Sequence, residues 1–186
     1  MNEIEIHPFS PYIPDNAKTL IIGSFPGREQ TQNATDANQW FYGARRNQFW
    51  IILSAVYNTE LTTKEDKQKL FNKMGIGITD IFLRVRRKKE SNSDKDLEII
   101  ENNEQALTLI LQKNKINIIL FTSKFVEDHF LTFFPDIKNY SCLLSPSPSA
   151  NIPISKSSEF LKFKKENPNG NTIDFRVVQY KQLLKV

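Results

Sequence analysis

Three polar loops in this 186-residue sequence contain side chains that could perform chemistry. The first is Gly-Ser-Phe-Pro-Gly at residues 23–27, whose glycines permit a tight turn and a close approach of the backbone to a ligand. The second is Trp-Phe-Tyr-Gly-Ala-Arg-Arg-Asn at residues 40–47, which combines aromatic, cationic and amide groups. The third is Ser-Pro-Ser-Pro-Ser-Ala-Asn at residues 145–151, where proline stiffens a serine-rich segment that could also be an ordinary surface loop.

These loops do not match the common nucleotide-binding or serine-hydrolase motifs. The first loop lacks the Gly-Lys-Ser/Thr of a Walker loop, and its spacing is not Gly-x-Gly-x-x-Gly. No serine lies in a Gly-x-Ser-x-Gly elbow, and the two histidines lie in a proline-rich N-terminal segment and on a predicted helix. The lone Cys142 rules out an internal disulfide and a metal site built from several thiolates. We therefore expect no metal and no cofactor.

A fourth polar segment, residues 84–89, contains five basic side chains in six positions. Such a run is usually a solvated face, and it becomes a candidate for phosphate contacts only beside a nucleic-acid cleft. The net charge of +4 and the pI of about 9.1 suit a nucleic-acid partner, although many other proteins share them.

Strand and helix patterns alternate along the chain between these loops. Apolar or β-branched runs predict strands, and amphipathic segments between capping residues predict helices. The predicted strands are 18–23, 76–82, 116–123 and 140–144, and the segment 174–186 is predicted to be a strand followed by a helical turn. The predicted helices begin near residue 46 or 47, cover 63–75 and 93–114, and run from 124 to the proline at 135.

This alternation predicts an α/β fold with three α/β/α layers around a mainly parallel central sheet of four to five strands. We expect residues 1–186 to form a single domain. Ligands of such sheets bind outside the carboxyl ends of the strands. The loops that follow Gly23, Asp80 and Leu144 should therefore meet at one edge.

Nothing in the sequence suggests a membrane or an export signal. No apolar run approaches the roughly 20 residues that span a bilayer, and the N-terminus lacks the basic flank and apolar stretch of a secretion signal. The composition, 39% hydrophobic and 25% charged, is typical of globular proteins. We expect a cytoplasmic monomer with no membrane contact.

The order of four motifs resembles the uracil-DNA glycosylase superfamily. They are Gly-Ser-Phe-Pro-Gly, Tyr-Gly-x-x-Arg-Asn-x-Phe-Trp at 42–50, Gly-Ile-x-x-x-Asp at 75–80 and Ser-Pro-Ser-Pro at 145–148. The resemblance extends from Leu20 to Asn151 and is greatest to the mismatch-specific uracil and the hypoxanthine (deoxyinosine) branches. The branches that bind iron–sulfur clusters through four cysteines are excluded by the lone Cys142.

The resemblance implies a DNA glycosylase of base excision repair, whose partner is DNA containing a deaminated or mismatched base. Such an enzyme flips the base into a pocket and cuts its N-glycosidic bond without a metal. The reaction needs a group that positions water near the sugar and donors that stabilise the departing base.

The resemblance assigns the catalytic roles to Asn47 and Ser24. An amide cannot accept a proton at neutral pH, so Asn47 would orient water or the sugar–base linkage by hydrogen bonds. Asn47 could also cap a helix, and both roles can hold together. Ser24 stands where the family often has Asp or Asn; a serine can hold a water but is a poor general base.

The expected base-binding residues are Gly23, Phe25, Tyr42 and Ser145. Backbone N–H groups around Ser24 and Phe25 would face the base, and the ring of Tyr42 would stack under it unless it belongs to the core. Ser145 replaces a histidine that stabilises the uracil anion in several uracil-specific members, so uracil cleavage is expected to be slow or absent.

The expected DNA contacts come from the third loop and from two arginines. Residues 150–152 would wedge the duplex, and the serine at 147 would contact phosphate. The full set is Ser147, Pro148, Ser149, Ala150, Asn151, Arg45 and Arg46.

Two other interpretations remain open on the sequence. A superfamily member could bind nucleic acid, a free base or a nucleotide without cutting the bond, and Ser24 and Ser145 favour that reading. Alternatively, an unrelated α/β hydrolase or nucleotide-binding protein could match these motifs by chance.

Overall fold

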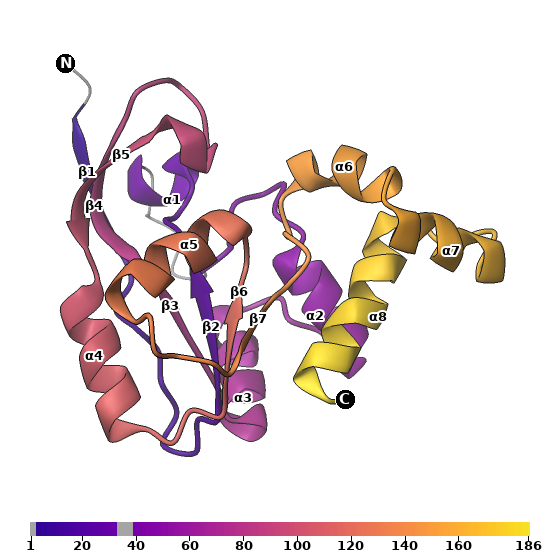
Figure 1. The fold of residues 1–186 in the computed structure, drawn as a ribbon, viewed down its shortest axis with the longest axis horizontal. Helices are drawn as coiled ribbons and strands as arrows, with labels where there is room; N and C mark the ends of the chain where they lie inside the picture. Colours follow the sequence, from indigo (N-terminus) through magenta and orange to yellow (C-terminus); the bar gives the residue numbers. More distant parts are fainter. Residues whose placement is uncertain (1–2, 33–38) are drawn as a thin grey trace.

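A parallel four-stranded sheet forms the centre of the molecule (Figure 1). The computed structural model describes residues 3–32 and 39–186. The strand order is β3-β2-β6-β7, with bounds β2 Thr19–Gly23, β3 Ile76–Asp80, β6 Ile118–Phe121 and β7 Tyr140–Cys142. The predicted α/β fold with a parallel central sheet is confirmed.

Alternate side chains of the strands are buried against helices on both faces of the sheet. In β2, Ile21 packs on the face covered by α2 Phe49–Tyr57, α3 Lys64–Met74 and α8 Thr172–Leu184. Leu20 and Ile22 pack on the opposite face, which α4 Glu104–Lys113 and α5 Lys124–Phe133 cover. Continuous apolar strands are the pattern of a sheet that is buried on both sides.

Capping residues fix the limits of α3 as the sequence predicts. Thr63 and Asp66 form a capping box at its start, and Gly75 ends it in the left-handed conformation with φ 62°. The first residue of β3 follows at once, so the cap sets the point at which the chain enters the sheet.

The predicted helix over 93–114 is wrong in its first half. A short 3-10 turn, η1 Asp94–Asp96, leads into β5 Leu97–Asn102, and only then does α4 begin. β5 pairs antiparallel with β4 Phe82–Arg87, which also pairs with β1 Ile4–Ile6 in a second sheet. Carboxylates of β5 face arginines of β4 across this hairpin, an interaction between strands that a helical pattern in one segment does not reveal.

The predicted strand within 174–186 is also wrong, because α8 covers this segment. Asn171 and Asp174 form a capping box at its start, and Tyr180 is fully buried on the sheet face that α8 shares with α2. Figure 1 shows α8 alongside α2.

The remaining helical elements are α1 Arg28–Gln32, η2 Pro148–Ala150, α6 Asn151–Ser155 and α7 Ser158–Glu166, of which α7 lies away from the sheet (Figure 1). No helix within residues 3–32 and 39–186 is long and apolar enough to cross a membrane.

Replacing Gly75 by alanine is expected to lower the free energy of unfolding by at least about 1–2 kcal/mol, the usual cost of a left-handed residue with a Cβ. A Cβ there would also lie 2.7 Å from the backbone oxygen of Asn16. Urea unfolding measures the change. Gly27→Ala is the control, because its Cβ would lie 3.4 Å from the nearest atom. Equal stability of the two variants would contradict this account of the cap.

Candidate active site at the carboxyl ends of the parallel strands

Gly23, the last residue of β2, is covered by two polar side chains. A Cβ at this position would lie 2.1 Å from the hydroxyl oxygen of Tyr42 and 2.3 Å from Oδ1 of Asp80. The Tyr42 hydroxyl is also 3.0 Å from Oγ1 of Thr122, which follows β6. The carboxyl ends of three neighbouring strands therefore converge here, where the sequence predicts a ligand site.

Tyr42 is held in a strained backbone conformation, with φ 58°. Its ring stacks on Phe49 with centroids 4.3 Å apart, so one ring face is covered by the first residue of α2. Burial raises the pKa of the Tyr42 phenol well above its ordinary value, with a further contribution from the charge of Asp80. The phenol is therefore a neutral hydrogen-bonding group.

Asp80 is buried and paired with His7, a residue that sequence reasoning did not assign to the site. The His7 Nε2 and Asp80 Oδ2 atoms are 2.9 Å apart, and the two side chains are only 4% and 6% exposed. The backbone N–H of Phe9 donates to His7 Nδ1, so the ring proton lies on Nε2 and is donated to Asp80. This pair fixes the carboxylate beside Gly23.

The first loop is clamped by the turn between β4 and β5. The Ser24 hydroxyl donates to Asp94 Oδ1 at 2.6 Å, and the backbone N–H of Arg28 donates to Asn92 Oδ1 at 3.0 Å. Burial raises the pKa of the Asp94 carboxyl above its ordinary value, and the hydrogen bond from Ser24 opposes part of that shift. Asp94 and Asn92 are further contacts that the sequence did not indicate, since their segment was predicted to begin a helix.

The backbone N–H groups of Ser24 and Phe25 donate to no acceptor within the part of the chain that the structure describes. Both residues are only partly buried, so a ligand at this edge could accept these hydrogen bonds. Phe25 is fixed by an edge-on contact with His7, with ring centroids 5.5 Å apart. The pair of amides is therefore held in place by the same histidine that orients Asp80.

The arginines of the basic segment at 84–89 form ion pairs within the second sheet. Its three arginines, in β4, pair with carboxylates of β5 and β1: Arg84 with Glu101, Arg86 with Glu98 and Arg87 with Glu5. The Arg87 pair is buried, and its guanidinium also donates to the Pro26 carbonyl at 2.6 Å. Most of this run is therefore structural, and it anchors the first loop.

Asn47 lies two residues before α2, which begins at Phe49 and so slightly later than predicted. Its Oδ1 accepts the backbone N–H of Phe49 at 2.9 Å, which fixes the orientation of the amide. Its Nδ2 group donates to no acceptor among the described residues. The next residue, Gln48, donates its N–H to the Pro146 carbonyl at 3.0 Å, which joins this turn to the third loop.

The third loop is held by hydrogen bonds from Arg176 of α8, whose side chain is fully buried. Its Nε donates to the Ser145 carbonyl at 2.8 Å, and its Nη1 donates to Asn151 Oδ1 at 2.7 Å. Tyr180 donates to the Leu144 carbonyl at 2.8 Å. No carboxylate pairs with Arg176 within the described ranges, so neutral oxygens alone satisfy this buried cation.

The other predicted DNA contacts lie on the surface around this loop. The hydroxyls of Ser147 and Ser149 are 2.8 Å apart, and the side chain of Ile152 is 66% exposed. Arg45 and Arg46 are exposed in the turn before α2. In contrast, the Asn151 side chain is turned inward to Arg176.

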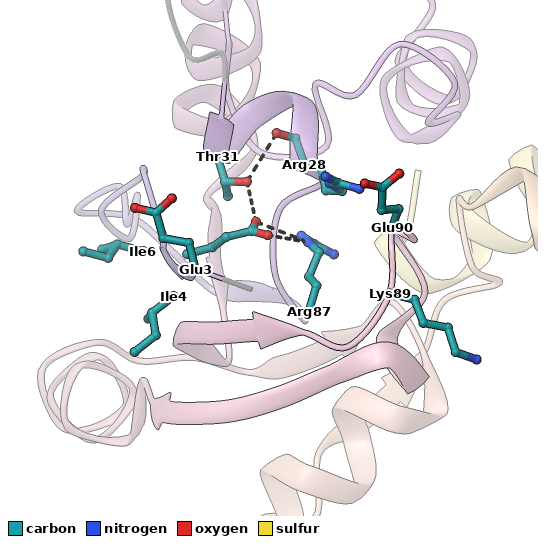
Figure 2. A pocket seen from close by; sticks show the side chains of 9 residues that line it. Glu3, Ile4, Ile6, Arg28, Thr31, Arg87, Lys89 and Glu90 are labelled. Carbon is teal, nitrogen blue, oxygen red and sulfur yellow. Dashed lines mark hydrogen bonds and ion pairs between the residues drawn. The ribbon is translucent and has the colours of Figure 1, made fainter. Parts of the chain in front are cut away.

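A separate cavity of about 540 Å³ lies between β1, α1 and the end of β4. Figure 2 shows that Arg28, Arg87 and Lys89 share its wall with Glu3 and Glu90. It contains none of the predicted catalytic, base-binding or DNA-binding residues. Its mixture of charges, with Arg87 already paired to Glu5, gives it no clear preference for one class of ligand.

A parallel sheet with fixed amide, hydroxyl and carboxylate groups at its carboxyl edge is the arrangement of an α/β ligand-binding or catalytic domain. Residues 10–166 match the uracil DNA glycosylase superfamily. The chain therefore belongs to this superfamily, and the resemblance found in the sequence is confirmed.

One protein is similar to this chain in sequence and another in fold. A hypoxanthine DNA glycosylase of Methanosarcina barkeri is 27% identical over 118 residues, which are 62% of this chain and 70% of that protein. The solution structure of a candidate uracil DNA glycosylase from Methanosarcina acetivorans superposes with a TM-score of 0.60 and 20% identity. That comparison covers 94% of this chain and 99% of the other, and it shows a shared fold.

Replacing Arg176 by methionine is expected to lower the free energy of unfolding by about 1–3 kcal/mol, because the buried oxygens of the third loop would lose their donors. Lys181→Met, an exposed position on the same helix, is the control and should change stability little. Urea unfolding of both variants measures the difference. An Arg176→Met protein as stable as the control would show that the loop does not depend on this cation.

Proposed function

We propose that this protein is a DNA glycosylase that hydrolyses the N-glycosidic bond of a deaminated base, hypoxanthine or uracil, flipped out of DNA. The superfamily membership and the named activity of the Methanosarcina barkeri relative support this function. Hypoxanthine is the preferred candidate, because Ser145 replaces the histidine of several uracil-specific members.

The observation that carries the proposal is the fixed amide of Asn47. Because Oδ1 faces the Phe49 N–H, the outward group is Nδ2, which is a hydrogen-bond donor. A donor held in one orientation can position the attacking water or the sugar–base linkage without reorganising during the reaction. The N-cap of α2 is Gln48 and not Asn47. The contact of Asn47 Oδ1 with the Phe49 N–H and the catalytic role of Asn47 are nevertheless compatible, since they use different atoms.

The departing base gathers negative charge as the bond breaks. The N–H groups of Ser24 and Phe25, which have no acceptor among the described residues, are suitable donors to it, because they lie on a fixed turn at the edge of the sheet. Tyr42 would offer the ring face that Phe49 does not cover for stacking with the base. Gly23 lets the tyrosine hydroxyl approach the turn closely.

The DNA backbone would lie across the exposed arginines and the third loop. Arg45 and Arg46 supply charge for phosphate contacts, and Ser147 and Ser149 supply hydroxyl donors. The exposed side chain of Ile152 suits an apolar wedge between base pairs.

Asn47→Ala is expected to lower the rate of base release by at least about 100-fold, the usual effect of removing one donor to the transition state. The assay uses duplexes containing hypoxanthine or uracil opposite each base, with alkaline cleavage of the abasic sites. DNA affinity should remain close to that of the unmodified protein, because the substitution removes no charge.

Asn139→Ala is the matched control, since Asn139 precedes β7 at the opposite edge of the sheet. An Asn47→Ala protein that cleaves at the control rate would refute the assignment of Asn47. No cleavage of any substrate by the unmodified protein, together with measurable DNA binding, would favour the alternative of a non-cutting binder.

Removing either Arg45 or Arg46 by alanine substitution is expected to weaken binding to all DNA sequences alike. The slope of log affinity against log salt should fall by about one for each phosphate that the protein no longer neutralises. Arg86→Ala is the control, because Glu98 already pairs with this arginine at 3.1 Å. A larger effect from Arg86 than from Arg45 and Arg46 would place the DNA on the second sheet instead.

A further inference from the structure

The first loop of this chain carries serine where the superfamily often carries an acid or an amide, yet a carboxyl group lies beside it. Asp94 Oδ1 accepts the hydroxyl proton of Ser24 at 2.6 Å, the distance of a short hydrogen bond between a hydroxyl and a carboxylate. The two residues are 70 positions apart in the sequence. The carboxyl group thus reaches the loop from a different part of the fold.

The turn that carries Asp94 is fixed by contacts of the two residues at 91 and 92. Asn92 accepts the N–H of Arg28, and Arg87 donates to the Ser91 carbonyl at 3.2 Å. The buried pair of Arg87 with Glu5 anchors this turn to β1. Asp94 therefore has a defined place relative to Ser24, as a catalytic proton acceptor needs.

Ser24 and Asp94 are both only partly buried, so solvent can reach the pair. When the hydroxyl donates to Asp94, the lone pairs of Ser24 Oγ remain available to accept a hydrogen bond from water. A serine alone cannot remove a proton from that water at neutral pH, whereas an ionised carboxylate behind it can receive one.

We propose that Asp94 is the general base of this active site and acts through Ser24 on the attacking water. This inference rests on the proposed glycosylase function. As the N-glycosidic bond breaks, its electron pair leaves with the base. The water oxygen bonds to C1′ of the sugar, its proton passes to Ser24 Oγ, and the serine proton passes to Asp94. The base anion then takes a proton from solvent, and Asp94 releases its proton to solvent.

The charged groups around Asp94 determine how this step depends on pH. Burial raises the pKa of Asp94, the charge of Asp80 at the end of β3 raises it further, and Arg87 of β4 and His129 of α5 lower it. The same turn carries two further charged residues, Lys95 and Asp96, and Oδ1 of Asp96 lies 3.7 Å from Nζ of Lys89. The net shift is upward, and the base must be ionised to accept a proton.

The rate of base release should therefore fall as the pH drops through the raised pKa of Asp94. Asp94→Asn keeps an oxygen that can accept the Ser24 hydrogen bond but cannot take its proton. It is expected to lower the rate by about 100-fold or more and to remove the acid limb of the pH profile.

Folding stability distinguishes this role from a structural one. A carboxyl whose pKa is raised in the folded state disfavours folding at neutral pH, where it is ionised, so Asp94→Asn should be as stable as the unmodified protein or more stable. If Asp94 had only a structural role, Asp94→Asn would show one of two other results. Either each folded molecule would keep normal activity, or activity would fall together with stability.

The experiment measures single-turnover release of hypoxanthine from duplex DNA across pH for the unmodified protein, Asp94→Asn, Ser24→Ala and the double variant. Asp96→Asn is the control, because this neighbouring carboxylate pairs with Lys89 instead of Ser24. The single variants should lose similar activity and the double variant little more, since the two residues act as a unit.

The inference is overturned if Asp94→Asn keeps the full rate and the acid limb, or if the two substitutions have additive effects. Should Asp94→Asn fail to fold, the pH profile of Ser24→Ala decides: an unchanged acid limb at full rate would exclude the relay. An unmodified protein that releases no base from hypoxanthine or uracil DNA would instead contradict the proposed function itself.

Discussion

The absence of a side chain at Gly23 is the constraint on which the candidate site depends. The hydroxyl of Tyr42 and the carboxylate of Asp80 both occupy the space that a Cβ would need. Through them, the end of β2 is joined to β3, to Thr122 after β6 and to His7 in the N-terminal segment. Any larger residue would force these polar groups away from the edge of the sheet and leave buried partners unsatisfied.

The loops at this edge are fixed by segments that are remote in the sequence. The β4–β5 turn holds the first loop through Asp94 and Asn92, and Arg176 of α8 holds the third loop through carbonyl oxygens. Asn47 is tied to the third loop through the N–H of its neighbour Gln48. The site is therefore preorganised by hydrogen bonds, which suits chemistry that depends on fixed donors and not on a strong nucleophile.

The sequence was sufficient for the elements with strong local signals. The apolar run of β6 and the capping threonine and glycine that bound α3 are predictable because each signal is local to its own element. The segment 93–102 was mistaken for a helix because its pairing with β4 depends on cross-strand contacts such as Arg86 with Glu98. The segment 174–186, predicted to begin as a strand, forms part of α8, and its packing against α2 is a contact that a local pattern does not reveal.

The candidate site was predictable only in part, for a related reason. The order of the motifs predicts Gly23, Ser24, Tyr42 and Asn47 as site residues. The predicted parallel sheet indicates that the loops of separate strands meet at one edge. His7 and Asp94 carry no local sequence signal for chemistry and lie 73 and 70 residues from their partners. The polar Ser-Asn-Ser-Asp stretch at 91–94 could have indicated a hairpin turn, although not its contact with Ser24.

The most direct test of the central claim is to follow the fate of a hypoxanthine-containing duplex in water labelled with a heavy oxygen isotope. The account predicts free hypoxanthine and an abasic sugar that carries the heavy oxygen at C1′, as mass spectrometry would detect. Duplex DNA that binds the protein but keeps its hypoxanthine, with no label incorporated, would contradict it.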